Sequence, residues 1–191
     1  MDLLLRVSPA LKAHRWGTSL AVALGLGLVG YLSRATYLDI PFLQDVLPAR
    51  VLVAVVAVVV AITPLYLTFP DLVDTLDRER AVRRVRPYGV VALALIAYLP
   101  AAVAVPDSVD DTRLFLAALT LGLLAVAAVG DLAWTVVFAA GFASLIVDTA
   151  PGAPVTSALA ACTTLGLAVA LAGATVLVGA VGPRRLRTLA D

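Results

Sequence analysis

The longest charged stretch of the chain runs from Phe69 to Pro87 and reads FPDLVDTLDRERAVRRVRP. It holds five of the fourteen basic residues, and long apolar runs lie on both sides of it. Its three aspartates precede all of its arginines, and this order suits a helix, whose dipole favours negative charge at the amino end and positive charge at the carboxyl end. Pro70 can open such a helix, and we expect Pro87 to close it. The stretch therefore predicts a charged helical loop between two apolar segments.

The composition around this stretch is that of a membrane protein. Of the 191 residues, 62% are hydrophobic and 14% are charged, and the mean hydropathy is +1.02. Soluble domains have about 45–50% apolar and about 25% charged residues. Apolar runs of about 17–25 residues, the length that crosses a bilayer, recur along the chain. We expect one transmembrane domain, residues 1–191, without an appended nucleotide-binding domain.

Six apolar runs predict an all-α integral membrane fold with six transmembrane helices. The predicted spans are residues 17–33, 48–69, 88–105, 114–130, 133–147 and 155–182. Ala21, Gly25, Gly27 and Gly30 in the first span predict close helix contacts, although glycine is also simply common in membrane helices. The short fifth span, the Pro/Gly-rich interruption at 148–154 and the long sixth span leave a re-entrant element before the last crossing open.

The distribution of basic residues predicts the orientation. Eleven of the fourteen lie in the amino-terminal segment, the charged stretch and the carboxyl-terminal tail, whereas only Arg34, Arg50 and Arg113 lie in the other predicted loops. The positive-inside rule then places both termini and the charged stretch on the cytoplasmic side of the plasma membrane. Residues 1–16 mix apolar and basic side chains and predict an amphipathic segment on the inner face, with Trp16 at the membrane edge.

The sequence carries no motif of an enzyme. His14 is the only histidine, and no His-Glu-x-x-His, Gly-x-Ser-x-Gly or phosphate-binding loop is present. We expect no catalytic residue, metal site or cofactor on this chain, and no nucleic-acid partner. Cys162, the single cysteine, is expected to be a small packing residue. No charged residue is predicted near the middle of a span, which disfavours a proton-coupled antiporter.

Two sets of residues are candidates for function. A short helix in the charged stretch can dock into a groove on a soluble ATPase, and the alternative is a solvated loop that only sets the topology. The candidate docking residues are Asp74, Leu76, Asp77, Arg78, Glu79, Arg80, Arg83 and Arg84. Mildly polar residues within the spans suit either helix packing or a pathway for an amphipathic substrate. They are Thr63, Thr120, Ser144, Thr163 and Thr164.

At the charged stretch the chain resembles ABC-2 type permeases, the membrane subunits of one class of ABC exporters. The likeness rests on the segment from Leu76 to Arg84, LDRERAVRR, which is similar to the family's Glu-Arg-containing segment before the third span. The amphipathic start and the six spans extend the likeness along the chain, whereas the Gly-Thr-Leu that usually follows Glu-Arg is missing. The resemblance implies a coupling helix in the 70–86 loop, a partner ATPase that binds ATP and Mg²⁺, and a second permease copy or a paralogue.

Two other classes of protein remain open. The substrate-binding membrane subunit of a vitamin or metal importer is also a six-span protein of similar length, and the 34–47 loop would be its lid. The low aromatic content, 6%, makes a specific vitamin pocket less attractive. A membrane accessory subunit without a transport role would have the same composition. For a transporter, the apolar spans indicate a hydrophobic or amphipathic substrate.

Overall fold

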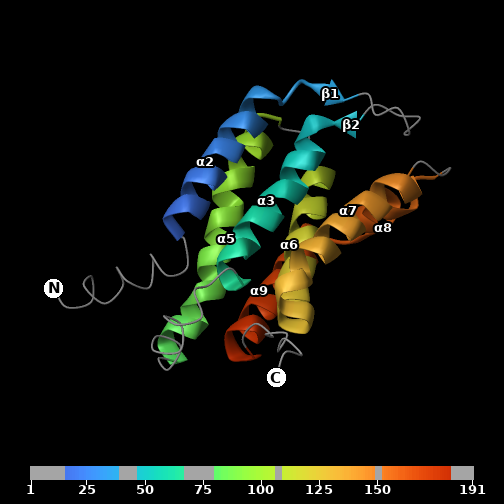
Figure 1. Cartoon of the computed structure of the whole chain (residues 1–191). Helices are drawn as coiled ribbons and strands as arrows, with labels where there is room; N and C mark the ends of the chain where they lie inside the picture. The colour runs from blue at the N-terminus through green and yellow to red at the C-terminus, as the bar shows by residue number, and fades with distance from the viewer. Residues whose placement is uncertain (1–15, 39–46, 67–79, 106–108, 149–151, 182–191) are drawn as a thin grey trace.

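The structure is a computed structural model that describes residues 16–38, 47–66, 80–105, 109–148 and 152–181. These residues form an all-α fold with one pair of very short strands (Figure 1). The helices are α2 (Trp16–Leu32), α3 (Ala49–Tyr66), α5 (Arg80–Val103), α6 (Val109–Val129), α7 (Ala133–Asp148), α8 (Pro154–Ala161) and α9 (Thr164–Val181). Strand β1 (Tyr37–Leu38) pairs antiparallel with β2 (Leu47–Pro48), and the 3-10 turn η1 (Gly130–Leu132) joins α6 to α7.

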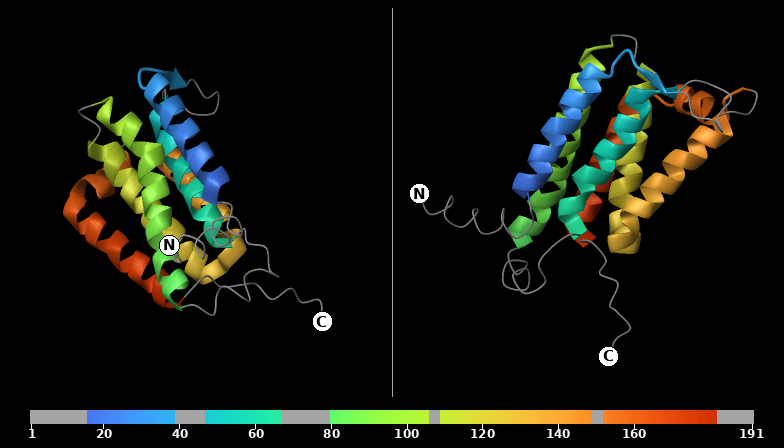
Figure 2. Two further views of the ribbon diagram at one scale, coloured as in Figure 1. Left: turned by 90° about the vertical axis from the view of Figure 1, so that its left-hand side faces the viewer. Right: turned by 45° about the horizontal axis from the view of Figure 1, so that its top comes forward.

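The long helices lie side by side and alternate in direction (Figures 1 and 2). Helix α3 contacts both α5 and α6 in the middle of the bundle, while α2 packs on α3 and α5, and α9 packs on α5 and α6. We call the end where α2 and α5 begin and α9 finishes the lower end, and the end that carries β1 and β2 the upper end (Figure 1). Helix α7 leans away from the bundle as it rises, and α8 lies beside it (Figure 2).

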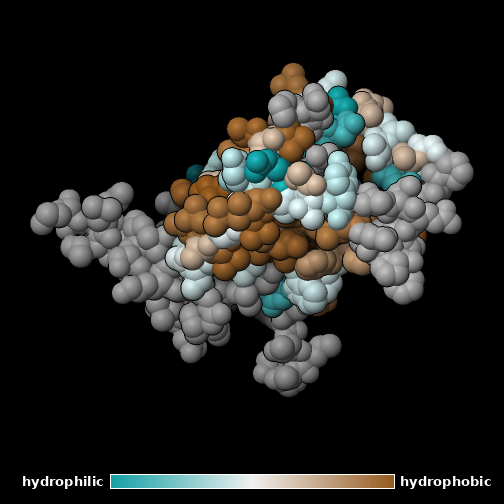
Figure 3. Space-filling view, turned by 90° about the horizontal axis from the view of Figure 1, so that it is seen from above, coloured by the Kyte–Doolittle hydropathy of each residue, from teal (hydrophilic) through white to brown (hydrophobic). Residues whose placement is uncertain are grey.

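Among the described residues, three helical stretches are long and apolar enough to cross a membrane: Arg84–Val103, Val109–Asp148 and Thr164–Val181. The second stretch is α6 and α7, which fold back on each other at Gly130, where φ is 59°. Trp16–Leu32 and Val51–Leu65 are shorter apolar helices. Helices of 18 to 24 residues are about 27–36 Å long, which matches a hydrocarbon core of about 30 Å. Figure 3 shows a broad hydrophobic patch on the outside of the bundle.

Small residues set the distance between α2 and its neighbours. The buried face of α2 consists of Ser19, Ala23, Gly27 and Gly30. A β-carbon on Gly27 would lie 3.0 Å from the carbonyl oxygen of Ile96 in α5, so the two backbones approach closely. The predicted close contacts are confirmed at Gly27 and Gly30. They are wrong at Gly25, which has no such neighbour within 4 Å, and at the exposed Ala21.

The predicted helix end at Pro87 is wrong. Helix α5 runs from Arg80 through Pro87 and Pro100 to Val103, so the last residues of the charged stretch belong to the helix predicted as the third span, 88–105. Proline removes one backbone hydrogen bond and crowds the preceding turn. Pro87 is nevertheless buried, and its Cγ lies 3.9 Å from a β-carbon built on Gly179 of α9. The helix therefore continues through a proline that is buried beside α9.

The predicted sixth span, 155–182, is wrong as a single helix. Helix α8 ends at Ala161, Cys162 is extended with φ −81° and ψ 136°, and α9 starts at Thr164. The hydroxyl oxygen of Thr163 accepts a hydrogen bond of 3.0 Å from the backbone N–H of Gly166, which caps the first turn of α9. Because this local cap competes with helix continuation, an unbroken apolar run does not give an unbroken helix.

The bounds of the other helices agree more closely with the predicted segments. Spans 17–33 and 133–147 match α2 and α7 to within one residue at each end, and span 48–69 matches α3 as far as Tyr66, beyond which residues 67–69 lie outside the described part. Span 114–130 starts too late, because α6 begins at Val109 and holds Asp110 and Asp111 in its first turn. Carboxylates are favourable there, since the amino end of a helix carries a partial positive charge.

Candidate partner-docking site

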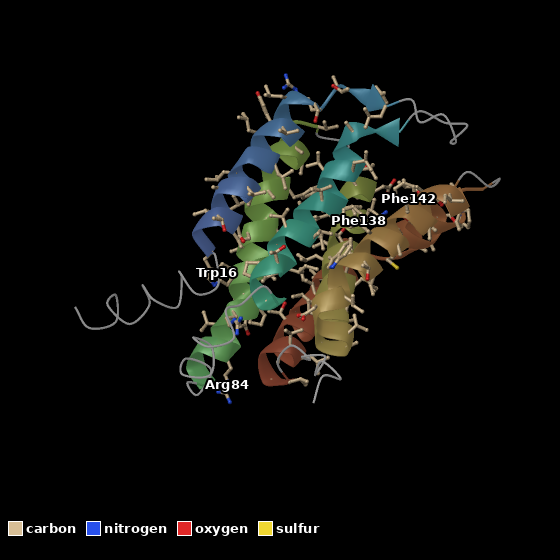
Figure 4. The ribbon with its side chains drawn as sticks, viewed as in Figure 1. Trp16, Arg84, Phe138 and Phe142 are labelled. Atoms are coloured by element: carbon tan, nitrogen blue, oxygen red, sulfur yellow. The ribbon has the colours of Figure 1, made fainter. Side chains whose placement is uncertain are left out.

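The structure describes part of the predicted docking site. Five of its residues lie outside the described ranges: Asp74, Leu76, Asp77, Arg78 and Glu79. The backbone of Arg80, Arg83 and Arg84 forms the first turns of α5. The side chain of Arg84 is exposed at the lower end of the bundle (Figure 4). This end of α5 is therefore where the docking residues join the apolar fold.

Apolar side chains accompany Arg84 on the exposed side of α5. Val85 and Tyr88 are both exposed. Arg84 and Val85 precede Tyr88 by about one helical turn, so the three side chains lie close together on the helix surface. Trp16 is at the same end of the bundle (Figure 4), where its ring covers Gly89. A cation next to an aromatic and an aliphatic surface can contact an acidic, partly apolar partner or the headgroup region of a membrane.

Arg86 points to the other side of α5. It is 6% exposed, and its Nη2 donates a hydrogen bond of 3.3 Å to the backbone carbonyl oxygen of Pro64 in the last turn of α3. The last carbonyls of a helix have no donor within the helix, and the partial negative charge there favours a cation. Arg86 therefore links the amino end of α5 to the carboxyl end of α3.

The sequence analysis did not select Arg86, although a signal was present. The buried residues of α5 recur with the period of a helix: Arg86, Pro87, Val90, Leu93, Ala94, Ala97, Tyr98 and Ala101. Arg86 is one turn before Val90 and continues this apolar stripe toward the lower end. Because Pro87 was expected to end the helix, Arg86 was not assigned to the buried stripe of α5.

Helix α9 also contacts the start of α5. A β-carbon on Gly179 would lie 3.4 Å from the carbonyl oxygen of Arg84 and 3.6 Å from its Cα. The absence of a side chain at Gly179 lets the last turn of α9 lie against the α5 backbone. The arginine-bearing start of α5 is thus held between α3 and α9.

The candidate residues for a substrate path form local hydrogen bonds. The hydroxyl groups of Thr63, Thr120 and Ser144 donate to backbone carbonyl oxygens three or four residues earlier, at 2.7 to 2.9 Å. Thr163 caps α9, and Thr164 is exposed. Such back-bonding is compatible with both helix packing and a substrate path, and both roles stay predictions. The hydrogen bonds of Thr63, Thr120 and Ser144 therefore do not join one helix to another.

In the described part of the chain, no group of three or more His, Cys, Asp or Glu side chains is placed to hold a metal ion. No protein-family model, no curated protein and no solved structure matches this sequence or fold. The function must therefore be argued from the residues and their geometry.

Proposed function

We propose that this chain is the transmembrane permease subunit of an ATP-driven exporter of the ABC-2 type. It moves a hydrophobic or amphipathic substrate, and a separate cytoplasmic ATPase binds the 70–86 segment. One observation carries the proposal. The arginine-bearing half of the charged stretch is continuous with α5, whose later turns are buried in the apolar bundle. A segment that is exposed at one end and buried at the other can pass a partner's movement into the membrane domain.

The proposed topology has six crossings, with α8 and α9 together forming the last. The alternating directions of the helices support it, because α2 begins and α9 finishes at the same lower end (Figure 1). Aromatic residues suited to membrane interfaces support it as well: Trp16 and Tyr88 near the lower end, Tyr31 and Tyr37 near the upper end. The lower end then faces the cytoplasm of the plasma membrane. A second copy or a paralogue completes the transport pathway.

Partner binding can be tested by purifying the tagged chain from its native membranes in mild detergent. We expect an ATP-hydrolysing subunit to co-purify. Replacing Asp77, Arg78, Glu79 and Arg80 together by alanine should reduce its recovery at least tenfold. Arg84→Ala should reduce it less, because it removes one exposed cation. Arg34→Ala is the matched control, since Arg34 is at the upper end, over the ring of Tyr31. Undiminished recovery with the fourfold variant would exclude this docking site.

The orientation can be tested by thiol labelling. In a Cys162→Ser background, Thr75→Cys places one cysteine in the charged stretch. A membrane-impermeant maleimide should label it in inverted vesicles and leave it unlabelled in right-side-out vesicles. The opposite pattern would place the charged stretch outside the cell, where no ATPase could reach it.

A further inference from the structure

The lower end of the bundle contains a buried cation that neither candidate site uses. Arg86 is 6% exposed, although charged side chains are rarely buried without a partner. Its hydrogen bond to the carbonyl oxygen of Pro64 spans 22 residues of sequence and joins two central helices. Removing a cation from water is unfavourable unless such partners compensate. A guanidinium at this position is therefore a feature that burial of apolar surface does not explain.

Pro64 places its carbonyl in the last turn of α3, where helix carbonyls need an external donor. Leu65, the next residue, is 3% exposed. The finish of α3 is thus covered by the protein, and Arg86 supplies one of the donors. A planar guanidinium reaches such a carbonyl with fixed geometry, whereas a lysine has a single flexible ammonium.

Arg84 and Arg86 lie two residues apart on α5 but differ in exposure, so they have different roles at this helix end. Arg84 is exposed, whereas Arg86 and Pro87 are buried. The backbone of Arg84 lies against Gly179 of α9. Consequently, a displacement of the start of α5 is resisted by α3 on one side and by α9 on the other.

We propose that Arg86 is a positioning residue that fixes the arginine-bearing start of α5 to the finish of α3. We call the contact between Arg86 and the carbonyl of Pro64 the clamp. Its role rests on the proposed function: the clamp makes α3 and α5 move together when an ATPase displaces the charged stretch. Arg84 and its exposed neighbours then contact the partner, and Arg86 passes the movement on.

The clamp can be tested without any partner by using Leu65→Cys as a reporter in a Cys162→Ser background. With Arg86 present, we expect Leu65→Cys to react slowly with maleimide in detergent micelles. Arg86→Met removes the donor at similar length and should raise the rate at least tenfold. Arg86→Lys should restore protection in part, because a cation and a donor return. Leu123→Cys, a fully buried site on α6, is the control for global unfolding and should remain protected in every variant.

The clamp would be overturned if Arg86→Met left the protection of Leu65→Cys unchanged. It would also be overturned if Arg86→Met raised the labelling rate of Leu123→Cys as much as that of Leu65→Cys. A second readout uses the ATPase. Arg86→Met should leave its co-purification within about twofold but lower the stimulation of ATP hydrolysis by the permease at least fivefold. Loss of co-purification instead would show that Arg86 acts in docking and would overturn its positioning role. If no ATPase binds even the unmodified chain, the proposed function fails, while the labelling result decides the clamp.

Discussion

The bundle side formed by α2, α3, α5 and α6 differs from the arm formed by α7 and α8. On the bundle side, fully buried residues recur along the helices, and a β-carbon on Gly27, Gly30 or Gly122 would meet a neighbouring helix within 3.4 Å. On the arm, α7 buries Ala133 and Val137, a β-carbon on Gly141 would lie 3.2 Å from Val55 of α3, and α8 buries none of its residues. Local hydrogen bonds join the end of α7 to the start of α8. Close packing therefore specifies the bundle side, whereas on the arm it is limited to α7 and capping holds α8.

The largest effect is expected from two phenylalanines on opposite sides of this comparison. Phe115 is 1% exposed and stacks on Tyr98, with ring centroids 4.1 Å apart. Phe115→Ala should lower the free energy of unfolding by about 3–5 kcal/mol, because it removes contacts and leaves a cavity. Phe142, on the arm (Figure 4), is 59% exposed. Phe142→Ala should cost less than about 1 kcal/mol. Unfolding in detergent micelles measures both, and equal losses would contradict the comparison.

Two glycines of α2 provide a smaller effect. Gly27→Ala places a methyl group 3.0 Å from the backbone oxygen of Ile96 and 3.1 Å from Cγ of Pro100. Because neither group can move freely, the variant should lose about 1–3 kcal/mol of stability. Gly25→Ala meets open space and should be neutral or gain up to about 1 kcal/mol from better helix propensity. Thermal melts of the two variants would settle this, and a reversed order would mean that α2 packs through its other face.

The arm should respond to loss of a cap. The carboxylate of Asp148 accepts hydrogen bonds from the N–H of Val155 at 2.7 Å, from the N–H of Thr156 at 3.2 Å and from the hydroxyl of Thr156 at 2.7 Å. Asp148→Ala should cost about 1–2 kcal/mol and expose these amides. Thr156→Val removes only the hydroxyl bond and should cost less. Hydrogen exchange at residues 155 and 156 is the measurement, and unchanged protection in Asp148→Ala would show that burial holds α8.

The smallest effect is expected at the turn before α8. Ala153 has φ 39° and ψ 68°, a left-handed conformation that is unfavourable for a residue with a β-carbon. Ala153→Gly should therefore stabilise the chain by about 0.5–1 kcal/mol. The matched control is Ala158→Gly, in the middle of α8, which should destabilise by about 1 kcal/mol. If both variants destabilise equally in thermal melts, the left-handed turn does not limit the stability of the arm.

Much of the fold could be predicted from apolar runs, since a chain in hydrocarbon must satisfy its backbone polar groups within helices. Spans 17–33 and 133–147 and the start of span 48–69 show this. The predictions failed where two local tendencies compete. Pro87 favours a helix end but is buried in α5, and Thr163 caps a new helix inside an apolar run. The docking role of the arginines stays a prediction, the continuity of the charged stretch with α5 was missed, and only the structure shows the inward direction of Arg86.

The amino-acid order alone establishes that the chain is helical and apolar, and where most helices lie, because length and hydropathy act locally along the chain. Three-dimensional packing was needed to show which face of α2 is buried, that α5 continues through Pro87, and that Arg86 binds the carbonyl of Pro64 while Arg84 is exposed. These outcomes depend on atoms of another helix, such as Ile96 for Gly27 and Pro64 for Arg86. The periodicity of a segment can indicate which face is buried, but it does not specify which residue of another helix lies against that face.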